Sequence, residues 1–365
     1  MAVKFVLDAE QRLFGETLDK MLSEADAPSA IRDWAVGTHE PGLALWRSLA
    51  DAGVLALAVP ESAGGAGPLP VELVTAFHEL GRHGVPGPYV ETVAAAALLG
   101  RLGDASPVAT WLPRIAEGAA VVSVALPPAV PYVLDADVAD LVLAVDGGEL
   151  RAAVPDATRA PASDLASPAP ARRSLDPARR LFAVGRSEAR ASGPAVTAAA
   201  AEAYDTGVLA CAAQLVGVGR RLLKVSVEYA RTRRQFGRPI GEFQAVKHHL
   251  ADALVSLEYA RPLVHGAALA HGTPDFPRDV SAAKVAASEA AYTAARIALQ
   301  VHGAIGYTDE YDPSLLIRKA RALRSAWGAP ADHRARVISS LATVSGPWRP
   351  DGTGPAGRAG HRRPR

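Results

Sequence analysis

The chain has almost no cysteine, and this absence excludes several kinds of site. Its 365 residues contain one cysteine, Cys211, so a single chain has no internal disulfide and no zinc or iron–sulfur centre built from cysteines. The neighbours of Cys211 are apolar, so we expect a small buried hydrophobic residue there and not a nucleophile. The sequence predicts no metal site.

The chain also lacks an excess of charge of either sign. Lys and Arg total 39 against 38 for Asp and Glu, a formal charge of +1, so no global field favours nucleic acid or an anionic membrane surface. No apolar run approaches the roughly 20 residues of a membrane span, and the first residues lack the apolar segment of a secretory signal. With 49% hydrophobic residues, we expect a soluble cytoplasmic protein of two or three domains with no nucleic-acid or membrane partner.

Residues 1–120 show a helical pattern. Asp8 and Gln11 fit an N-cap and its partner in a capping box, and apolar residues follow at spacings of three and four. Residues 64–68 contain three glycines and then Pro68, with Pro70 close behind, where a phosphate-binding helix would have to begin. We therefore predict a loop at 64–68, followed by a helix at about 71–80, in an N-terminal α-helical domain.

The composition changes to a β pattern over residues 121–195. The segments 121–126, 141–145 and 150–154 predict strands, and Asp146-Gly-Gly148 predicts a hairpin turn. Residues 155–170 are so rich in Pro, Ala and Ser that loops must interrupt the domain. These features predict a small, shortened middle β domain.

Helical periodicity returns over residues 196–345. One apolar stripe comprises Leu215, Val218, Leu222 and Val225, and another comprises Val246, Leu250, Ala253 and Leu257. At least two long amphipathic helices therefore pack here, and we predict a C-terminal four-helix bundle. Residues 346–365 have too few apolar side chains to offset the entropy of ordering, so we expect a disordered basic tail.

Short motifs in three parts of the chain indicate what it does. The first part of the chain has Leu57-Ala-Val-Pro-Glu61 and Glu79-Leu-Gly-Arg82, and the predicted bundle has Arg233-Arg-Gln-Phe-Gly-Arg-Pro-Ile240, then Phe243-Gln244, and later the segment from Gln300 to Glu310. In this order and spacing the chain resembles the acyl-CoA dehydrogenase family. The resemblance implies an α+β fold that is mostly α: an N-terminal helical domain, a small middle β domain and a C-terminal four-helix bundle.

The resemblance also implies an FAD-dependent enzyme that acts on acyl-CoA thioesters. In the family, a carboxylate removes a proton beside the thioester carbonyl while a hydride passes from the next carbon to the flavin. Arg233 matches the cation that meets the FAD pyrophosphate of a neighbouring subunit, because a guanidinium pairs bidentately with phosphate oxygens. The residues that match cofactor-binding segments are Arg233, Gln235, Phe236, Phe243, Gln300, Gly303 and Ala304.

Both cofactor segments also have a purely structural interpretation. The arginines at 231, 233 and 234 could be a solvated charge run at a helix end, where cations are favoured. In this interpretation residues 302–306 only end a helix in a left-handed cap, and His302 is a hydrogen-bonded structural residue. Ala304 departs from the family pattern of two adjacent glycines, which let the backbone approach the cofactor closely.

The residue that should act as the base is missing. The family's usual base is a glutamate in a Tyr-Glu-Gly-Thr segment, and alignment on Gly328 places Trp327 at that position. Ala326 stands in place of the tyrosine and Ala329 in place of the threonine. Because an indole cannot abstract a proton, three polar functions are absent together.

Some members of the family carry the base on the bundle helix after the Phe-Gln segment. Here that helix offers Asp252 and Glu258, and we take Glu258 as the candidate base. A simple ion pair with Arg261, three residues later on the same helix, is the competing role for Glu258.

The middle domain departs from the family as well. The loop of hydroxyl-bearing residues that holds the flavin ring is replaced by Leu126-Pro-Pro-Ala-Val-Pro-Tyr-Val-Leu-Asp135, and no tryptophan-bearing strand follows it. The half of the site that holds the reacting end is thus degraded, while the half that grips the distal end of FAD is intact.

Two classes of function follow. The chain could be one subunit of a hetero-oligomer, of the α2β2 kind that acts on bulky acyl-CoA substrates including steroid side chains, with a related chain supplying the base or with this chain purely structural. It could instead be a self-sufficient homo-oligomer that uses Glu258. In either case electron-transfer flavoprotein is the expected acceptor. A flavin monooxygenase or acyl-carrier-protein dehydrogenase on this fold has no positive sign in the sequence.

Overall fold

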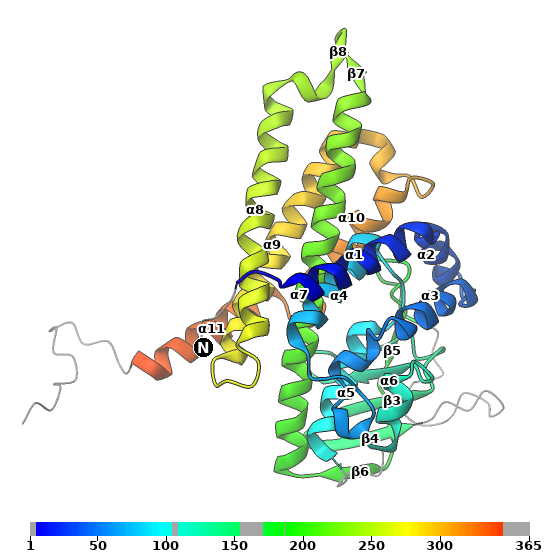
Figure 1. The fold of residues 1–365 in the computed structure, drawn as a ribbon, viewed down its shortest axis with the longest axis vertical. Coiled ribbons are helices and arrows are strands. Elements are labelled where there is room, and N and C mark those ends of the chain that lie inside the picture. The colour runs from blue at the N-terminus through cyan, green and yellow to red at the C-terminus, as the bar shows by residue number, and fades with distance from the viewer. Residues whose placement is uncertain (1–4, 104–108, 154–170, 186, 346–365) are drawn as a thin grey trace, which may run out of the picture.

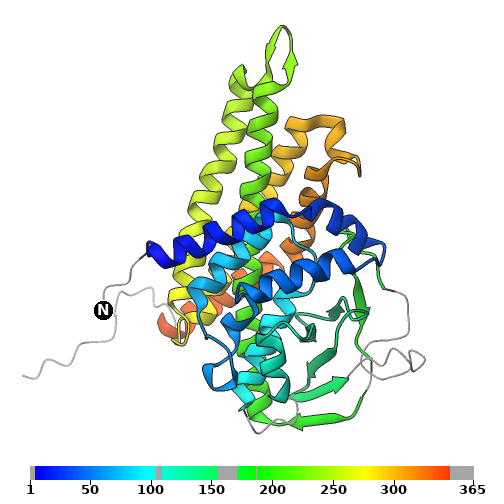
Figure 2. The same ribbon diagram turned by 45° about the vertical axis from the view of Figure 1, so that its right-hand side comes forward.

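The computed structural model describes residues 5–103, 109–153, 171–185 and 187–345. Short helices lie on one side of a group of long helices, and a small sheet lies below them in the view of Figure 1. The turned view in Figure 2 shows the same arrangement, with the tip of two long helices projecting beyond the rest of the chain. The expected mostly helical fold with a small sheet domain is confirmed.

The N-terminal part is helical, as its pattern predicts. The side chain of Asp8 accepts a hydrogen bond from the backbone amide of Gln11, and the side chain of Gln11 accepts one from the backbone amide of Asp8, so the predicted capping box starts the first helix. Residues 64–68 form a loop. The helices are α1 (Ala9–Glu24), α2 (Ala27–Ala35), α3 (Glu40–Asp51), α4 (Pro70–His83), α5 (Tyr89–Leu102) and α6 (Leu112–Ala116).

A four-stranded sheet forms the centre of the middle part, with the strand order β1-β3-β4-β6. Strands β1 and β3 are parallel, and the other pairs are antiparallel. The predicted hairpin is confirmed, because Gly147 and Gly148, both with positive φ, join β3 to β4. The strands are β1 (Val122–Ala125), β3 (Leu141–Asp146), β4 (Glu149–Ala153) and β6 (Ala189–Ser192).

Like β6, two further strands of the middle part lie where the sequence pattern predicts none. A separate antiparallel pair joins β2 (Tyr132–Leu134) to β5 (Leu181–Ala183). The first falls in the proline-rich segment that replaces the family's flavin loop. The loops predicted at 155–170 and the tail predicted at 346–365 lie outside the described residues.

Five helices make up the C-terminal part: α7 (Pro194–Thr232), α8 (Gln244–Leu269), α9 (Phe276–His302), α10 (Asp312–Ser325) and α11 (Pro330–Ser345). Helix α7 runs from the sheet to the projecting tip, beside α4 and α5 on one side and α8 and α9 on the other. Its backbone meets α4 very closely, since a Cβ on Gly217 would lie 2.0 Å from the carbonyl oxygen of His78. Cys211 is buried in α7, as expected.

None of the helices in the described ranges is both long enough and apolar enough to cross a bilayer.

Candidate functional site

The projecting tip carries the first predicted cofactor segment. Helix α7 ends at Thr232, and a short hairpin of β7 (Arg234–Gln235) and β8 (Arg238–Pro239) leads to α8 (Figure 1). Arg234 donates to the carbonyl oxygen of Gly237 at 3.0 Å, and the Arg238 guanidinium lies 4.2 Å from the ring centre of Phe243. These two arginines therefore stabilise the hairpin itself.

Arg233 differs from Arg234 and Arg238, because its guanidinium does not stabilise the hairpin. Its backbone amide bonds to Tyr229 and its carbonyl accepts from Ile240, so the residue is anchored at the end of the helix. Its side chain is exposed and makes no hydrogen bond or ion pair with any described residue. Gln235 and Phe236 next to it are exposed as well, and Phe236 is 91% exposed. The tip thus offers a free guanidinium beside an uncovered aromatic ring.

The second predicted segment lies next to the first. The ring of His302, at the end of α9, is 4.5 Å from the ring of Tyr229, which is one turn before Arg233. His302 is buried and its Nδ1 donates to the Ala298 carbonyl at 2.7 Å, so it is hydrogen-bonded within its own helix, as expected. The fold therefore brings two segments some 70 positions apart, Arg233 and Gln300, to one end of the bundle.

The end of α9 has the geometry of a helix terminus that needs glycine. Gly303 has a φ of 67°, in the left-handed region that favours glycine, and a 3-10 turn follows it. Gln300, Gly303 and Ala304 are all exposed. Gly303 is thus required by the helix end, and the surface beside it is open to an approaching group.

These residues fit part of the expected FAD. An anchored arginine without an internal partner suits a phosphate, because charge-assisted hydrogen bonds from a guanidinium to phosphate oxygens are short and strong. Arg233 would hold the pyrophosphate, with Gln235 and Phe236 beside it and Gln300 at the same end of the bundle. The cofactor roles of these residues stay predictions.

Trp327 occupies the position at which the family's base is expected. Its side chain is 2% exposed, and its Nε1 donates to Glu91 Oε1 at 3.2 Å. Gly207 makes room for the ring, since a Cβ there would lie 2.2 Å from it. Trp327 has a φ of 57°, which is costly for a bulky residue and persists only where surrounding contacts enforce it. The indole is a fixed part of the interior.

Buried polar groups hold the backbone around this indole. The carbonyl oxygen of Trp327 accepts from His333 Nε2 at 2.8 Å and from the Tyr204 hydroxyl at 3.3 Å. The fully buried Lys284 donates to the Gly328 carbonyl at 3.4 Å, and burial lowers the pKa of its ammonium. Burial also lowers the pKa of His333 to about 4. These contacts hold the segment with the indole turned inward.

A cavity of about 410 Å³ lies beside Trp327, between the small sheet domain and α10. Glu91 on α5 and Arg179 also line it, and Arg179 Nη2 is 3.7 Å from Glu91 Oε1. Glu91 is not among the residues predicted from the sequence. A signal was present, since Glu91 is the single acidic residue of helix α5, in a stretch from Tyr89 to Leu99 that is apolar apart from Thr92.

Glu258 lies elsewhere. It pairs with Arg220 of α7 and not with Arg261 of its own helix, because the side chain reaches across to the neighbouring helix. It lines a different cavity, of about 850 Å³, between α1, α4, α7 and α8. The structure does not bring Glu258 together with Trp327 in one cavity.

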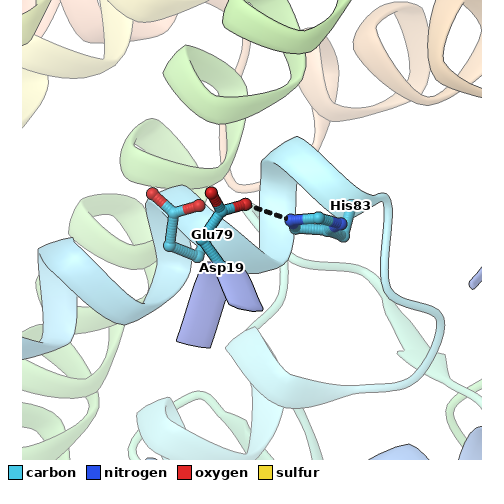
Figure 3. A group of neighbouring side chains, drawn as sticks. All are labelled: Asp19, Glu79 and His83. Atoms are coloured by element: carbon cyan, nitrogen blue, oxygen red, sulfur yellow. Dashed lines mark hydrogen bonds and ion pairs between the residues drawn. The ribbon is translucent and has the colours of Figure 1, made fainter. Parts of the chain in front are cut away.

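Three side chains in that larger cavity region have atoms that a metal ion could use. Asp19, Glu79 and His83 offer atoms within 4.8 Å of one another (Figure 3). His83 Nε2 lies 2.7 Å from Asp19, and Arg82 lies 3.3 Å from Asp19 and 2.7 Å from Glu79. Since Arg82 already pairs with both carboxylates and His83 pairs with Asp19, the group is an ion-pair network between α1 and α4 and gives no reason to place a metal.

Comparison with known proteins shows which family the chain resembles. The family model described as the N-terminal domain of acyl-CoA dehydrogenase matches residues 8–119, and the model of the C-terminal domain matches residues 197–341. Acyl-CoA dehydrogenase IpdE2 of Mycobacterium tuberculosis is 34% identical over 333 residues, which cover 91% of this chain and 97% of IpdE2. IpdE2 of Mycolicibacterium smegmatis is 33% identical and covers 92% of this chain and 100% of its own length.

Solved structures have the same fold. A chain of the ChsE4–ChsE5 complex of Mycobacterium tuberculosis has a TM-score of 0.76 at 25% identity, over 93% of this chain and 99% of its own. A chain of the Tcur3481–Tcur3483 steroid ACAD has a TM-score of 0.77 at 24% identity, and the match covers 92% of this chain and 98% of that one. With both family domains matched and full-length relatives above 30% identity, the chain belongs to the acyl-CoA dehydrogenase family of FAD-dependent oxidoreductases.

Proposed function

We propose that this chain is one subunit of a hetero-oligomeric acyl-CoA dehydrogenase, and that a related partner chain supplies the base for α,β-desaturation of an acyl-CoA thioester. The observation that carries the proposal is the buried indole of Trp327 at the base position. An indole has no lone pair that can take a proton, and the contacts to Glu91 and Gly207 hold the ring in the interior.

The projecting tip supports a partner chain. A large apolar side chain that is 91% exposed, Phe236, stands beside the free guanidinium of Arg233. Such a surface is suited to be covered by another chain that brings the rest of a cofactor site. When FAD is bound there, it supplies the hydride acceptor. This chain's contribution is to hold the phosphates with Arg233 and to present Gln300 on the same surface.

The similar structures favour the assembly. The ChsE4–ChsE5 structure is a complex of two different chains, and the Tcur3481–Tcur3483 protein is named as a steroid ACAD. We therefore propose an α2β2 assembly with a related chain, a bulky acyl-CoA such as a steroid-derived one as the substrate, and electron-transfer flavoprotein as the acceptor.

The test is the composition of the purified enzyme. We expect this chain to be poor in flavin or insoluble alone, and to become yellow and soluble when co-expressed with an acyl-CoA dehydrogenase homologue encoded beside it. Mass measurement of the intact assembly would then give two different chains in equal number. A yellow homo-oligomer that turns over acyl-CoA without any partner would overturn the proposal.

A self-sufficient enzyme with Glu258 as the base is the competing function, and one substitution separates the two. Under our proposal Glu258→Gln leaves turnover by the assembly unchanged, because the carboxylate pairs with Arg220. Glu228→Gln, on the exposed face of α7, is the matched control. Loss of turnover in Glu258→Gln alone would favour the competing function.

A further inference from the structure

The cavity beside Trp327 contains a buried polar atom that lacks a partner. Glu91 is 2% exposed and lines this cavity of about 410 Å³. Its Oε1 accepts from Trp327 Nε1 at 3.2 Å and lies 3.7 Å from Arg179 Nη2. Its Oε2 has no hydrogen-bond partner among the described residues. A buried acceptor left unpaired is unfavourable, so this oxygen is a place where a ligand gains free energy by donating a hydrogen bond.

The walls of the cavity show what the remainder of such a ligand is like. Most of the lining side chains are apolar, and they come from both the sheet domain and α10: Val130, Pro131, Leu134, Leu181, Ala322 and Ala326. The volume falls within the range of roughly 300–1,000 Å³ that is typical of small-molecule sites. Tyr132, Ser174 and Ser325 also line the cavity, which therefore suits a largely apolar group that carries a polar function.

The charges around Glu91 decide between a neutral and a cationic donor. Arg179 already provides the counter-charge that a buried carboxylate requires, and a second cation, Arg321, lines the same cavity. An ammonium group would meet two guanidinium groups of its own sign. A hydroxyl donates one hydrogen bond without bringing charge, so it fits better.

We infer that this cavity recognises an acyl group bearing a hydroxyl, and that Glu91 Oε2 accepts the hydrogen bond from that hydroxyl. The inference rests on the proposed function in one respect, namely that the ligand is an acyl-CoA. Glu91 is then a specificity-determining residue. It makes no contact with the reacting carbons.

Binding, measured without turnover, tests the inference. Dissociation constants of the full-length chain, purified with its partner where it needs one, would be measured by calorimetry for matched pairs of ω-hydroxyacyl-CoA and acyl-CoA from butanoyl to decanoyl. At the chain length that reaches Glu91, we expect the hydroxylated member to bind about tenfold more tightly or better, as a charge-assisted hydrogen bond provides. A terminal methyl ketone of the same length should show no such gain, because a carboxylate cannot donate to it.

Glu91→Gln is the informative variant, because its amide can still accept from Trp327 Nε1 while an NH₂ group takes the place of the free acceptor. We expect the hydroxyl preference to fall, because the charge-assisted hydrogen bond to a carboxylate is replaced by at best a neutral one between the amide and the hydroxyl. Glu202→Gln, whose carboxylate pairs with Arg101 outside this cavity, should keep the preference. No hydroxyl preference at any length in the unmodified chain, or the same preference in Glu91→Gln, would overturn the inference. Flavin bleaching by the chain alone would contradict only the proposed function.

Discussion

Replacing Trp327 with alanine should destabilise the chain strongly, because the account treats this indole as a fixed part of the interior. The side chain is 2% exposed, lies against Gly207 and donates its only polar hydrogen to Glu91. Removing a large buried aromatic side chain costs about 3–5 kcal/mol, since the cavity left behind collapses only in part. We expect a loss of this size in the free energy of unfolding, measured by urea titration of the purified assembly or chain.

Trp327→Phe separates packing from hydrogen bonding. Phenylalanine keeps most of the ring contacts but leaves Glu91 Oε1 without its donor, a loss of about 1–3 kcal/mol for a buried acceptor. The alanine variant should therefore be clearly the less stable of the two. Losses below about 0.5 kcal/mol in both variants, the size expected at a surface position, would refute the reasoning. They would mean that the ring swings out of the site.

Three further predictions concern the same two regions. Gly207→Ala places a Cβ 2.2 Å from the Trp327 ring, so we expect a loss of about 1–3 kcal/mol in urea unfolding that largely disappears in the Trp327→Ala background; an undiminished loss there would show that the two sites are independent. Arg233→Ala should weaken FAD binding about tenfold or more, read from flavin content, while the exposed Arg231→Ala should not; equal flavin content in both would mean that the phosphate role is misassigned. Burial lowers the pKa of His333 to about 4 from 6.5, so its neutral form contributes stability above pH 6.5 that is lost as the pH falls through 4. In His333→Gln the fall in unfolding free energy over this range should be shallower, and an identical fall would show that another group is responsible.

Much of the fold can be predicted from local patterns. The capping box of Asp8 and Gln11, the glycine hairpin at 146–148 and the long amphipathic helices all lie where the sequence predicts them. These features depend on residues close together in the chain. Strands β2 and β5 could not be predicted, since three-residue strands that pair across about 50 positions leave no periodic signal.

The candidate site also has features that local sequence predicts and features that depend on how the helices pack. The sequence predicts the loss of the base at Trp327 because that residue falls within a recognisable segment, whereas the predicted partner of Glu258 was wrong. A spacing of three within one helix suggests Arg261, but the contact with Arg220 depends on how α7 and α8 pack. Glu91 is separated from Trp327 by 236 positions, so only the folded chain brings them together.

The origin of the base is the central claim, and reduction of bound flavin by substrate tests it most directly. The chain would be reconstituted with FAD, alone and together with its partner, and mixed anaerobically with acyl-CoA while the flavin absorbance is followed. Bleaching only in the presence of the partner, abolished by changing a carboxylate of the partner and retained in Glu258→Gln of this chain, is the predicted result. Bleaching by this chain alone would contradict the account.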